Sequence, residues 1–251
     1  WEEGWVKVNK PTNSIDRSVG IIGAGPGGLA AADILRQEGL EITIYDRYDR
    51  AGGLLTYGIP GFKLEKDIVM RRNEQLAKSG VKFVLNTNVG VDITFDEIRE
   101  KHDFVILATG VYKARELDIP NGNLNGKVAA LDYLTASNKL SFGDIVKEFE
   151  AGAYNADGKK VVVIGGGDTA MDCVRTAVRQ GATSVKCLYR RDRANMPGSQ
   201  REVQNAEEEG VIFEWLTSPR SLANNLKIND LSNFEAQEGD LKGIIVKKMR
   251  L

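Results

Sequence analysis

Two apolar runs that break into glycines and then continue as helices predict an α/β protein with two Rossmann-like dinucleotide-binding domains. The first pattern is Ser18–Gly28 (SVGIIGAGPGG), and the second is Val161–Ala170 (VVVIGGGDTA). One such pattern is a weak signal, but two copies, each with a strand before the glycines and a helix after them, are a strong one. A chain of 251 residues is long enough for two domains of this kind. We therefore expect two dinucleotide ligands.

The composition is that of a globular protein with little net charge. Hydrophobic residues make up 42% of the chain and charged residues 27%, and the net charge is −1 at pH 7. This balance gives no general attraction to nucleic acid or to an anionic membrane, so neither is expected as a partner. No apolar run approaches the length of a membrane span and no signal peptide precedes the first glycines, which favours a cytoplasmic protein. Because the chain begins with Trp1 rather than methionine, we expect an upstream part of the natural chain to be missing.

Cysteine and histidine usage excludes several kinds of site. Cys173 and Cys187 form no C-x-x-C pair, which argues against a dithiol redox centre and an iron–sulfur site. Both lie in apolar periodic runs, so buried, unreactive thiols are expected. The only histidine, His102, follows a helix-like stretch, where it could favour the negative end of that helix. We therefore expect no metal site and no catalytic side chain.

The first glycine pattern belongs to a complete strand–helix–strand unit. Ser18–Ile22 is predicted as a strand, Leu29–Leu40 as a helix and Glu41–Tyr45 as a second strand. The glycines allow a tight turn and a close approach of the backbone to a pyrophosphate, and the helix N-terminus offers free N–H groups. Asp46 follows Gly23 by 23 residues, where a carboxylate accepts hydrogen bonds from an adenosine ribose. The alternative is a glycine turn that serves only to pack the helix on the strand.

Further segments extend this first domain. Arg50–Phe62 is rich in glycine but too apolar for a plain connector, and it would suit a flat ring with a polar edge. Phe104–Leu107 is predicted as a buried parallel strand, and Ala108–Gly110 would then lie at the sheet edge where ligands bind. Between them we expect three elements: a helix (Lys66–Ser79), a strand (Val81–Leu85) and a short helix (Phe95–Glu100).

The second glycine pattern begins with a predicted buried strand at Val161 and continues as a helix from about Asp168 to Arg179. Its second strand, Val185–Tyr189, ends in Arg190 and Arg191, which we align with Asp46 of the first unit. A carboxylate there suits two ribose hydroxyls, whereas two arginines suit a 2′-phosphate. The alternative is a pair of arginines on a solvated strand end. The comparison predicts a flavin dinucleotide on the first turn and a nicotinamide dinucleotide phosphate on the second.

The chain around the second unit has further predicted elements. They are a loop crossing between domains at 111–127, a helical stretch at 128–150, a helix at Gln200–Glu209, a strand at Val211–Trp215 and a strand near Gly243–Lys247.

Five motifs in family order give the chain a clear resemblance to the small (beta) subunit of NADPH-dependent glutamate synthase. The same FAD/NADPH module occurs in dihydropyrimidine dehydrogenase and in NADPH–ferredoxin reductases. The motifs are Gly23–Gly28 (GAGPGG), Gly52–Pro60 (GGLLTYGIP), Ala108–Gly110 (ATG), Gly165–Asp172 (GGGDTAMD) and Tyr189–Pro197 (YRRDRANMP).

This resemblance implies cofactors and the residues that hold them. FAD would lie on the first turn and NADPH on the second. For FAD the implied residues are Gly23, Ala24, Gly25, Pro26 and Gly27 at the pyrophosphate, Asp46 at the ribose, Gly53, Leu54 and Lys63 along the flavin, Val89 near the adenine, and Thr109 and Gly110 closing the site. For NADPH they are Gly166, Gly167, Asp168 and Thr169 at the pyrophosphate, and Arg190 and Arg191 at the 2′-phosphate.

The chain also departs from the family pattern. The family has N-terminal cysteine clusters for [4Fe–4S] centres and a C-terminal FAD segment, and neither occurs here, so we expect the chain to be a fragment with these clusters only in the missing N-terminal region. Position 46 is Asp where the longer Glu is common. We expect an N-terminal arm (1–17), the first part of an FAD-binding domain (18–118) and an NADPH-binding domain (119–251).

The resemblance implies hydride transfer from NADPH to FAD, followed by single-electron steps to a partner protein. That partner would be the glutamate synthase large (alpha) subunit, which converts 2-oxoglutarate and glutamine to glutamate, or another electron acceptor protein. Three alternatives remain open from the residues. They are another NADPH–ferredoxin or iron–sulfur electron-transfer flavoprotein, a disulfide reductase of the thioredoxin-reductase type, which would need a dithiol, and a non-enzymatic NADPH-binding regulatory module.

Overall fold

The computed structural model describes residues 3, 5–114, 116–224 and 239–250. The four-residue spacing of Trp1 and Trp5 in the sequence would suit one helical turn, but Trp1 lies outside the described residues. The chain separates into two compact units, Trp1–Tyr112 and Lys113–Leu251. The finer division into an arm (1–17) and two domains (18–118 and 119–251) stays a prediction.

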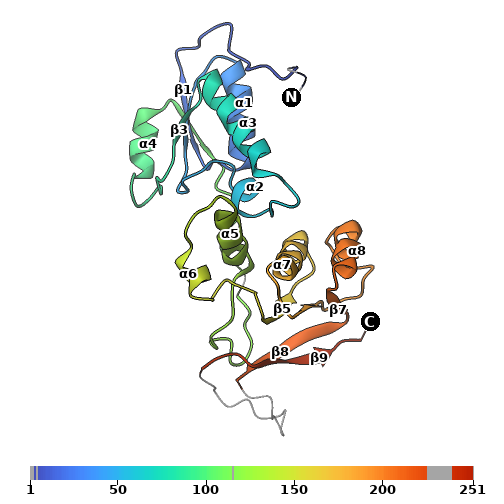
Figure 1. The fold of residues 1–251 in the computed structure, drawn as a ribbon. Coiled ribbons are helices and arrows are strands. Elements are labelled where there is room, and N and C mark those ends of the chain that lie inside the picture. Colours follow the sequence, from blue (N-terminus) through green and yellow to red (C-terminus); the bar gives the residue numbers. More distant parts are fainter. Residues whose placement is uncertain (1–2, 4, 115, 225–238, 251) are drawn as a thin grey trace. The chain divides into compact units, whose positions relative to one another are not determined.

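The first unit is built around a parallel sheet with the strand order β3-β2-β1-β4 (Figure 1). Its strands are β1 (Ser18–Ile22), β2 (Glu41–Tyr45), β3 (Lys82–Val84) and β4 (Phe104–Leu107). β1 pairs with both β2 and β4, so the first glycine turn leaves the carboxyl end of an inner strand. This is the edge of an α/β sheet at which ligands bind.

Four helices accompany this sheet: α1 (Pro26–Gln37), α2 (Leu54–Tyr57), α3 (Lys66–Ser79) and α4 (Phe95–Lys101). Alternate residues of β1 face opposite sides of the sheet. Ile21 shares a core with Leu29 of α1 and Leu76 of α3, whereas Ile22 shares a separate core with Ile98 of α4. Accordingly α1 and α3 cover one face and α4 the other, as Figure 1 shows.

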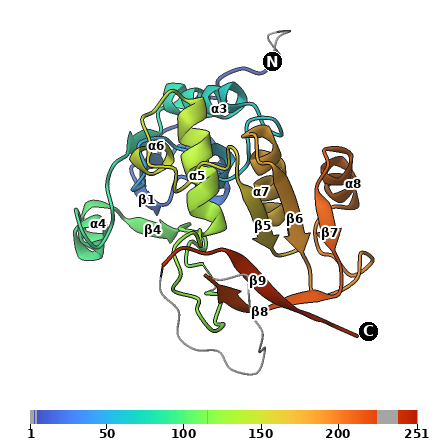
Figure 2. The same cartoon turned by 60° about the horizontal axis from the view of Figure 1, so that its bottom comes forward.

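The second unit contains a parallel sheet with the order β5-β6-β7 and a separate antiparallel pair, β8-β9 (Figures 1 and 2). Its strands are β5 (Lys160–Ile164), β6 (Ser184–Leu188), β7 (Ile212–Glu214), β8 (Thr217–Ala223) and β9 (Gly243–Lys248). Its helices are α5 (Ala130–Ser141), α6 (Lys147–Glu150), α7 (Asp168–Arg179) and α8 (Gln200–Glu208).

The core of the second unit joins α7 and α8 to one face of its parallel sheet. Val185 and Cys187 of β6 contribute to it, together with Met171 and Val174 of α7 and Val203 of α8. Both β6 residues lie at alternate positions, as expected for a strand with one covered face. The structure therefore confirms the predicted α/β class with two Rossmann-like units, each with a strand–glycine–helix–strand core.

Two expectations about the elements were wrong in detail, and one strand was missed. Helix α1 begins at Pro26, three residues before the predicted start, because proline has no N–H to lose in the first turn. The predicted helical stretch 128–150 is two helices, α5 and α6, separated by a turn at Gly143. The strand β8 was not predicted; it contains Pro219, and its pairing with β9 is irregular next to that residue.

Burial of two strands was also overestimated. Phe104 and Leu107 of β4 are 59% and 67% exposed, and Val162 and Ile164 of β5 are each 38% exposed. In the part of the chain that the structure describes, β4 and β5 are outer strands of their sheets. The parallel pairing predicted for β4 is confirmed, and β5 also pairs in parallel, but an outer strand buries less of its surface than an inner one.

Candidate nucleotide-binding sites

The first glycine turn joins β1 to α1. The backbone N–H of Gly23 donates to the carbonyl of Tyr45, the last residue of β2, at 2.8 Å. Gly25 is the residue before α1, and among the described residues no side chain caps the N–H groups of this helix end. Those N–H groups and the positive end of the helix dipole suit an anion such as a pyrophosphate.

The glycines of this turn serve two different purposes. A Cβ on Gly28 would lie 1.9 Å from the carbonyl oxygen of Gly23, so Gly28 is needed for packing of the helix on the turn. A Cβ on Gly25 or Gly27 would meet no described protein atom within 4 Å. Packing therefore explains Gly28, whereas Gly25 and Gly27 leave open space next to the free N–H groups. A dinucleotide fits this arrangement.

The carboxylate of Asp46 lies against the same turn. Its Oδ2 accepts a hydrogen bond from the backbone N–H of Ala24 at 2.6 Å, and its Oδ1 accepts one from Tyr48 at 2.9 Å. A carboxylate offers about four acceptor positions, so both oxygens can still accept hydrogen bonds from ribose hydroxyls. The structure thus brings Asp46 next to the glycine turn, and its carboxylate holds that turn.

The glycine-rich loop after β2 packs on the turn as well. The N–H of Gly52 donates to the carbonyl of Ala24 at 2.7 Å, and a Cβ on Gly53 would lie 2.8 Å from the Cα of Gly25. Leu54, the first residue of α2, is 43% exposed, and Lys63 is exposed beyond it. The close approach at Gly53 explains a glycine at this position.

The remaining predicted residues of the first unit lie in two different places. The N–H of Ala108 donates to the carbonyl of Ile22 at 2.8 Å, which holds Ala108 next to the glycine turn. Thr109 and Gly110 follow Ala108 and are exposed. Val89 instead forms an isolated bridge with Ile93 and packs against the core that contains Ile98. Its side chain is half-buried there.

Three residues beside this site were missed by the sequence analysis. The guanidinium carbon of Arg47 lies 5.0 Å from the ring centre of Tyr48 and 4.4 Å from that of Tyr112. These cation–π contacts tie the segment after Gly110 to the end of β2. The positions of Arg47 and Tyr48 directly after Asp46 were a sequence signal for these two residues. No local signal pointed to Tyr112, because it is distant in sequence.

The second glycine turn repeats the first in backbone geometry. The N–H of Gly165 donates to the carbonyl of Leu188, the last residue of β6, at 3.1 Å. Gly167 precedes α7, and no described side chain caps that helix end. A Cβ on Gly167 would meet no described atom within 4 Å, whereas one on Gly166 would lie 2.5 Å from the ring of Tyr189. A second dinucleotide fits this turn.

The register corrects the predicted alignment of the arginines with Asp46. Ile22 pairs with Tyr45 in the first sheet, and Ile164 pairs with Leu188 in the second. The position equivalent to Asp46 is therefore Tyr189, and Arg190 stands one residue later. The reason is an extra residue in the second unit, where 24 residues separate Gly165 from Tyr189, against 23 between Gly23 and Asp46.

Arg190 and Arg191 remain directly beyond the strand and are exposed. Within residues 3, 5–114, 116–224 and 239–250, neither side chain forms a hydrogen bond or an ion pair, so both guanidinium groups are available to an anion. Arg193 differs, because it forms an ion pair with Glu207 at 2.8 Å. Thr169 is exposed in the first turn of α7, and Asp168 before it accepts a hydrogen bond from the N–H of Ser199 at 3.0 Å.

The two cysteines are buried, as predicted. Burial raises the pKa of Cys173 and of Cys187 to about 12 in each case. Both thiols therefore stay protonated at neutral pH and are poor nucleophiles.

His102 has a structural position. Its Nε2 lies 3.0 Å from the hydroxyl of Tyr45, and its ring fills the space beside Gly20. Burial and then Lys101 lower the pKa of His102, so the ring is neutral at pH 7 and does not provide the expected charge at the end of α4.

The described part of the chain has no cluster of three or more histidine, cysteine, aspartate or glutamate side chains that could hold a metal ion. None of its described helices has the length and hydrophobicity needed to span a membrane.

Comparisons with known proteins add the family context. A family model described as "Pyridine nucleotide-disulphide oxidoreductase" matches residues 17–247. The chain is 65% identical to a "Putative glutamate synthase [NADPH] small chain" of Cereibacter sphaeroides over all 251 of its residues, and it spans 57% of that protein. It is 47% identical to the "Putative oxidoreductase AegA" of Escherichia coli, where the match covers 89% of this chain and 34% of the relative. In fold it is similar to Mycobacterium tuberculosis FprA in complex with NADPH, with a TM-score of 0.71 and 18% identity, covering 94% of this chain and 69% of FprA.

Proposed function

Because this chain belongs to the pyridine nucleotide-disulphide oxidoreductase family, we propose that it binds FAD on its first glycine turn and NADPH on its second. The full-length protein would pass hydride from NADPH to FAD and deliver electrons to a partner. Its 65% identical relative supports a role as the small subunit of an NADPH-dependent glutamate synthase.

One observation carries this proposal: the two glycine turns are alike in backbone geometry but opposite in the charge beside them. The first turn has the carboxylate of Asp46 against it, whereas Arg190 and Arg191 are exposed directly beyond the strand that ends beside the second. A carboxylate accepts hydrogen bonds from ribose hydroxyls and repels a 2′-phosphate. Guanidinium groups bind a 2′-phosphate well, which supports NADPH on the second turn.

In the first unit, Gly25 and Gly27 would admit the FAD pyrophosphate to the free N–H groups at the start of α1. Asp46 would bind the ribose. Leu54 and Lys63 would lie along the flavin ring, with Thr109 and Gly110 closing the site and Val89 near the adenine. The exposure of Leu54, Lys63, Thr109 and Gly110 is compatible with these roles.

In the second unit, Gly166 and Gly167 would bring the NADPH pyrophosphate to the start of α7, next to Thr169. Arg190 and Arg191 would bind the 2′-phosphate. When bound, NADPH supplies a hydride and the flavin accepts it and passes electrons on, so the protein needs to contribute binding and alignment rather than a proton donor. A route through the thiols is disfavoured, because both cysteines are buried and their pKa values are raised to about 12.

The proposal is tested by anaerobic titration of the full-length flavoprotein with NADPH, monitored at the flavin absorbance band. We expect bleaching of that band with NADPH at concentrations where NADH has little effect. A protein that purifies without flavin, or whose flavin is reduced equally well by both nucleotides, would contradict the assignment of the two turns.

The electron acceptor is a separate question. The identity to AegA supports a second candidate, an electron-transfer flavoprotein with another acceptor. Mixing the full-length protein with a glutamate synthase large subunit should give NADPH-dependent formation of glutamate from 2-oxoglutarate and glutamine. Flavin reduction without glutamate formation in that mixture would favour the second candidate, and nucleotide binding without flavin reduction would favour a regulatory module.

A further inference from the structure

We infer that Asp168 and the ion pairs between α7 and α8 position the loop Arg190–Ser199, and that this positioning determines the preference for NADPH. The loop follows β6, carries both exposed arginines and ends at the start of α8. The inference rests on the proposed function, since it concerns how Arg190 and Arg191 are held against a 2′-phosphate. A pair of exposed arginines on a loose loop would lose conformational entropy on binding. A loop that is already fixed loses less of it, and this favours binding.

Three hydrogen bonds attach this loop to the second glycine turn and its strand. The N–H of Gly198 donates to the carbonyl of Gly166 at 2.8 Å, and the N–H of Ser199 donates to Oδ1 of Asp168 at 3.0 Å. The hydroxyl of Tyr189 donates to the carbonyl of Asn195 at 2.9 Å. The end of the loop is therefore bound to the turn and the start of α7, and its middle is bound to Tyr189 directly after β6.

Close packing supports the same conclusion independently. Gly198 is buried, and a Cβ there would lie 3.0 Å from the carbonyl oxygen of Gly166 and 3.4 Å from the carbonyl carbon of Gly167. Met196, two residues earlier, is 6% exposed and belongs to the core of the second unit. The end of the loop thus lies directly on the backbone that would hold the pyrophosphate.

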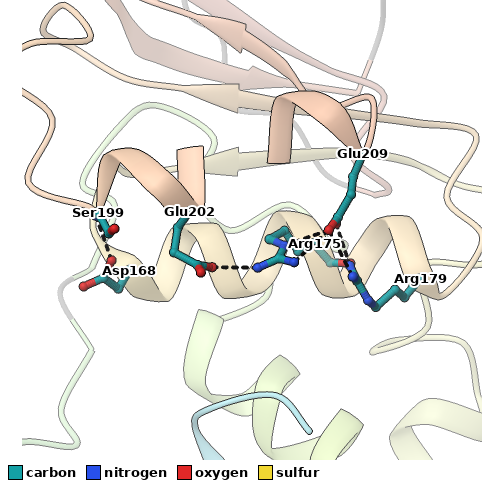
Figure 3. Close-up of polar contacts among 6 residues, drawn as sticks. All are labelled: Asp168, Arg175, Arg179, Ser199, Glu202 and Glu209. Atoms are coloured by element: carbon teal, nitrogen blue, oxygen red, sulfur yellow. Dashed lines mark hydrogen bonds and ion pairs between the residues drawn. The ribbon is translucent and has the colours of Figure 1, made fainter. Parts of the chain in front are cut away.

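The far end of the loop is fixed through helix α8, as Figure 3 shows. Arg175 of α7, which is 8% exposed, donates through Nη1 to Glu202 at 2.7 Å and through Nη2 to Glu209 at 2.8 Å. Arg179 donates through Nη2 to the same Glu209 at 3.0 Å. Burial by itself raises the pKa of Glu209, but the hydrogen bonds from Arg179 and Arg175 outweigh it and lower this pKa to about 2. Glu209 is therefore ionised at neutral pH, and α8 is bonded to α7 along its length.

This arrangement gives Asp168 a role different from phosphate binding. A carboxylate on the first residue of α7 would repel a pyrophosphate at the same helix end. Its acceptance of the Ser199 N–H directs Oδ1 to the loop instead (Figure 3). The side chain of Asp168 is then a positioning group for the arginine loop, while the N–H groups of α7 remain for the pyrophosphate.

Ser199 offers a matched pair of variants that tests this role. Its φ of −55° is compatible with proline, and its side chain makes no capping hydrogen bond to α8. Ser199→Pro therefore removes the N–H that Asp168 accepts, whereas Ser199→Ala retains it. The dissociation constants of NADP⁺ and NAD⁺ would be measured by calorimetry on the full-length protein, with amide hydrogen exchange of residues 190–199 as a second readout.

We expect Ser199→Pro to lower the preference for NADP⁺ over NAD⁺ about tenfold, the equivalent of one charge-assisted hydrogen bond to the 2′-phosphate. NAD⁺ affinity should stay the same, exchange in the loop should rise, and Ser199→Ala should behave as the parent protein. Gly198→Ala is a second variant, for use if Ser199→Pro fails to fold. Its added methyl group would displace the loop from the turn, so the same result is expected.

Two results would overturn the inference: equal loss of affinity for both nucleotides, or an unchanged preference in both Ser199→Pro and Gly198→Ala. The double variant Arg190→Ala/Arg191→Ala separates failure of this inference from failure of the proposed function. If that variant keeps the preference for NADP⁺, the assignment of the arginines to the 2′-phosphate is wrong. If it loses the preference while the loop variants keep it, only the positioning role is wrong.

Discussion

The two glycine turns use a carboxylate in opposite ways. In the first unit, Asp46 comes from the end of the second strand and accepts a hydrogen bond from Ala24 in the turn. In the second unit, Asp168 follows the turn itself and accepts one from Ser199 at the end of the loop that carries the arginines. The first carboxylate is thus held against its own glycine turn, and the second is directed to the loop that carries the arginines. The backbone geometry is shared, so the proposed difference in ligand rests on the residues that follow the second strand of each unit.

The surroundings of the two turns differ as well. A Cβ on Gly23 would lie 2.4 Å from the carbonyl oxygen of Ala108, which follows the outer strand β4. Among described atoms, a Cβ on Gly165 would meet only the Cβ of Ala170, at 3.4 Å. The first turn is therefore confined by a neighbouring strand, whereas the second depends on the loop Arg190–Ser199 for its support.

The largest effect should come from filling the open space in each turn. Gly25 and Gly167 both have extended backbone that any residue adopts, and a Cβ on either would meet no described atom within 4 Å. Valine should therefore be tolerated by the fold but collide with a bound pyrophosphate. We expect Gly25→Val to abolish FAD retention, and Gly167→Val to retain FAD but lose most of its reduction by NADPH. The measurements are the flavin content of the full-length protein and its anaerobic reduction.

These two variants control for each other. Both place the same side chain at the same position of a glycine turn, so a general effect on folding would appear in both. Undiminished flavin in a folded Gly25→Val protein, or flavin loss in Gly167→Val alone, would reverse the assignment of the two turns.

The next largest effect should come from the arginines beyond β6. Each hydrogen bond to a charged group contributes about 1.5–3 kcal/mol, so Arg190→Ala with Arg191→Ala should lower kcat/KM for NADPH by roughly 10²- to 10⁴-fold. NADH should be little affected, because it lacks the 2′-phosphate. Flavin-reduction kinetics with both nucleotides, at several salt concentrations, would measure this. Arg193→Ala is the control, because Arg193 is ion-paired with Glu207. Equal losses for NADPH and NADH would assign the arginines to the fold.

The sequence predicted the two strand–glycine–helix units because their periodicity is local. It did not predict the alignment of Tyr189 with Asp46, since the extra residue of the second unit becomes visible only in the register of β6. The exposure of Leu107 and Ile164 depends on strand order, which distant segments decide. The link between Asp168 and Ser199 joins residues far apart in the chain, and no local pattern signals it.

A smaller effect concerns acid stability of the second unit. The pKa of Glu209 is lowered to about 2 in the folded state from an ordinary value of 4.5. Its ion pairs therefore stabilise the fold above the ordinary pKa, and this contribution is lost as the pH falls from about 5 towards 2. We expect Glu209→Gln to lower the free energy of unfolding by about 1–3 kcal/mol at pH 7 and to reduce its dependence on acid. Urea unfolding at a series of pH values would measure both.

The first unit offers a control for this effect. Glu74 and Lys78 form an exposed ion pair on α3, where both side chains are 67% exposed. Exposed pairs contribute little to stability. Glu74→Gln should therefore leave the unfolding curves nearly unchanged, and an effect of Glu74→Gln as large as that of Glu209→Gln would argue against a special role for the α7–α8 ion pairs.

The smallest effect is expected at the cysteines, and the first unit shows which replacements to use. Cys187 pairs with Val163 as Ile44 pairs with Ile21, so an aliphatic side chain occupies the equivalent position of the first unit. Cys173 is the sixth residue of α7, as Ala31 is the sixth residue of α1.

We therefore expect Cys173→Ala with Cys187→Val to leave NADPH-dependent flavin reduction unchanged. Thiol chemistry requires a thiolate, and burial raises the pKa of each thiol to about 12, which leaves almost none at neutral pH. A loss of about 1 kcal/mol in stability is still expected, because Cys187 Sγ donates to the carbonyl of Gly165 at 3.3 Å and Cys173 is packed in the core. Stopped-flow reduction and thermal unfolding of the full-length double variant separate these effects. Flavin reduction that fails in a variant with normal flavin content and normal unfolding would require a thiol in the electron path, and the two turns alone would no longer account for the activity.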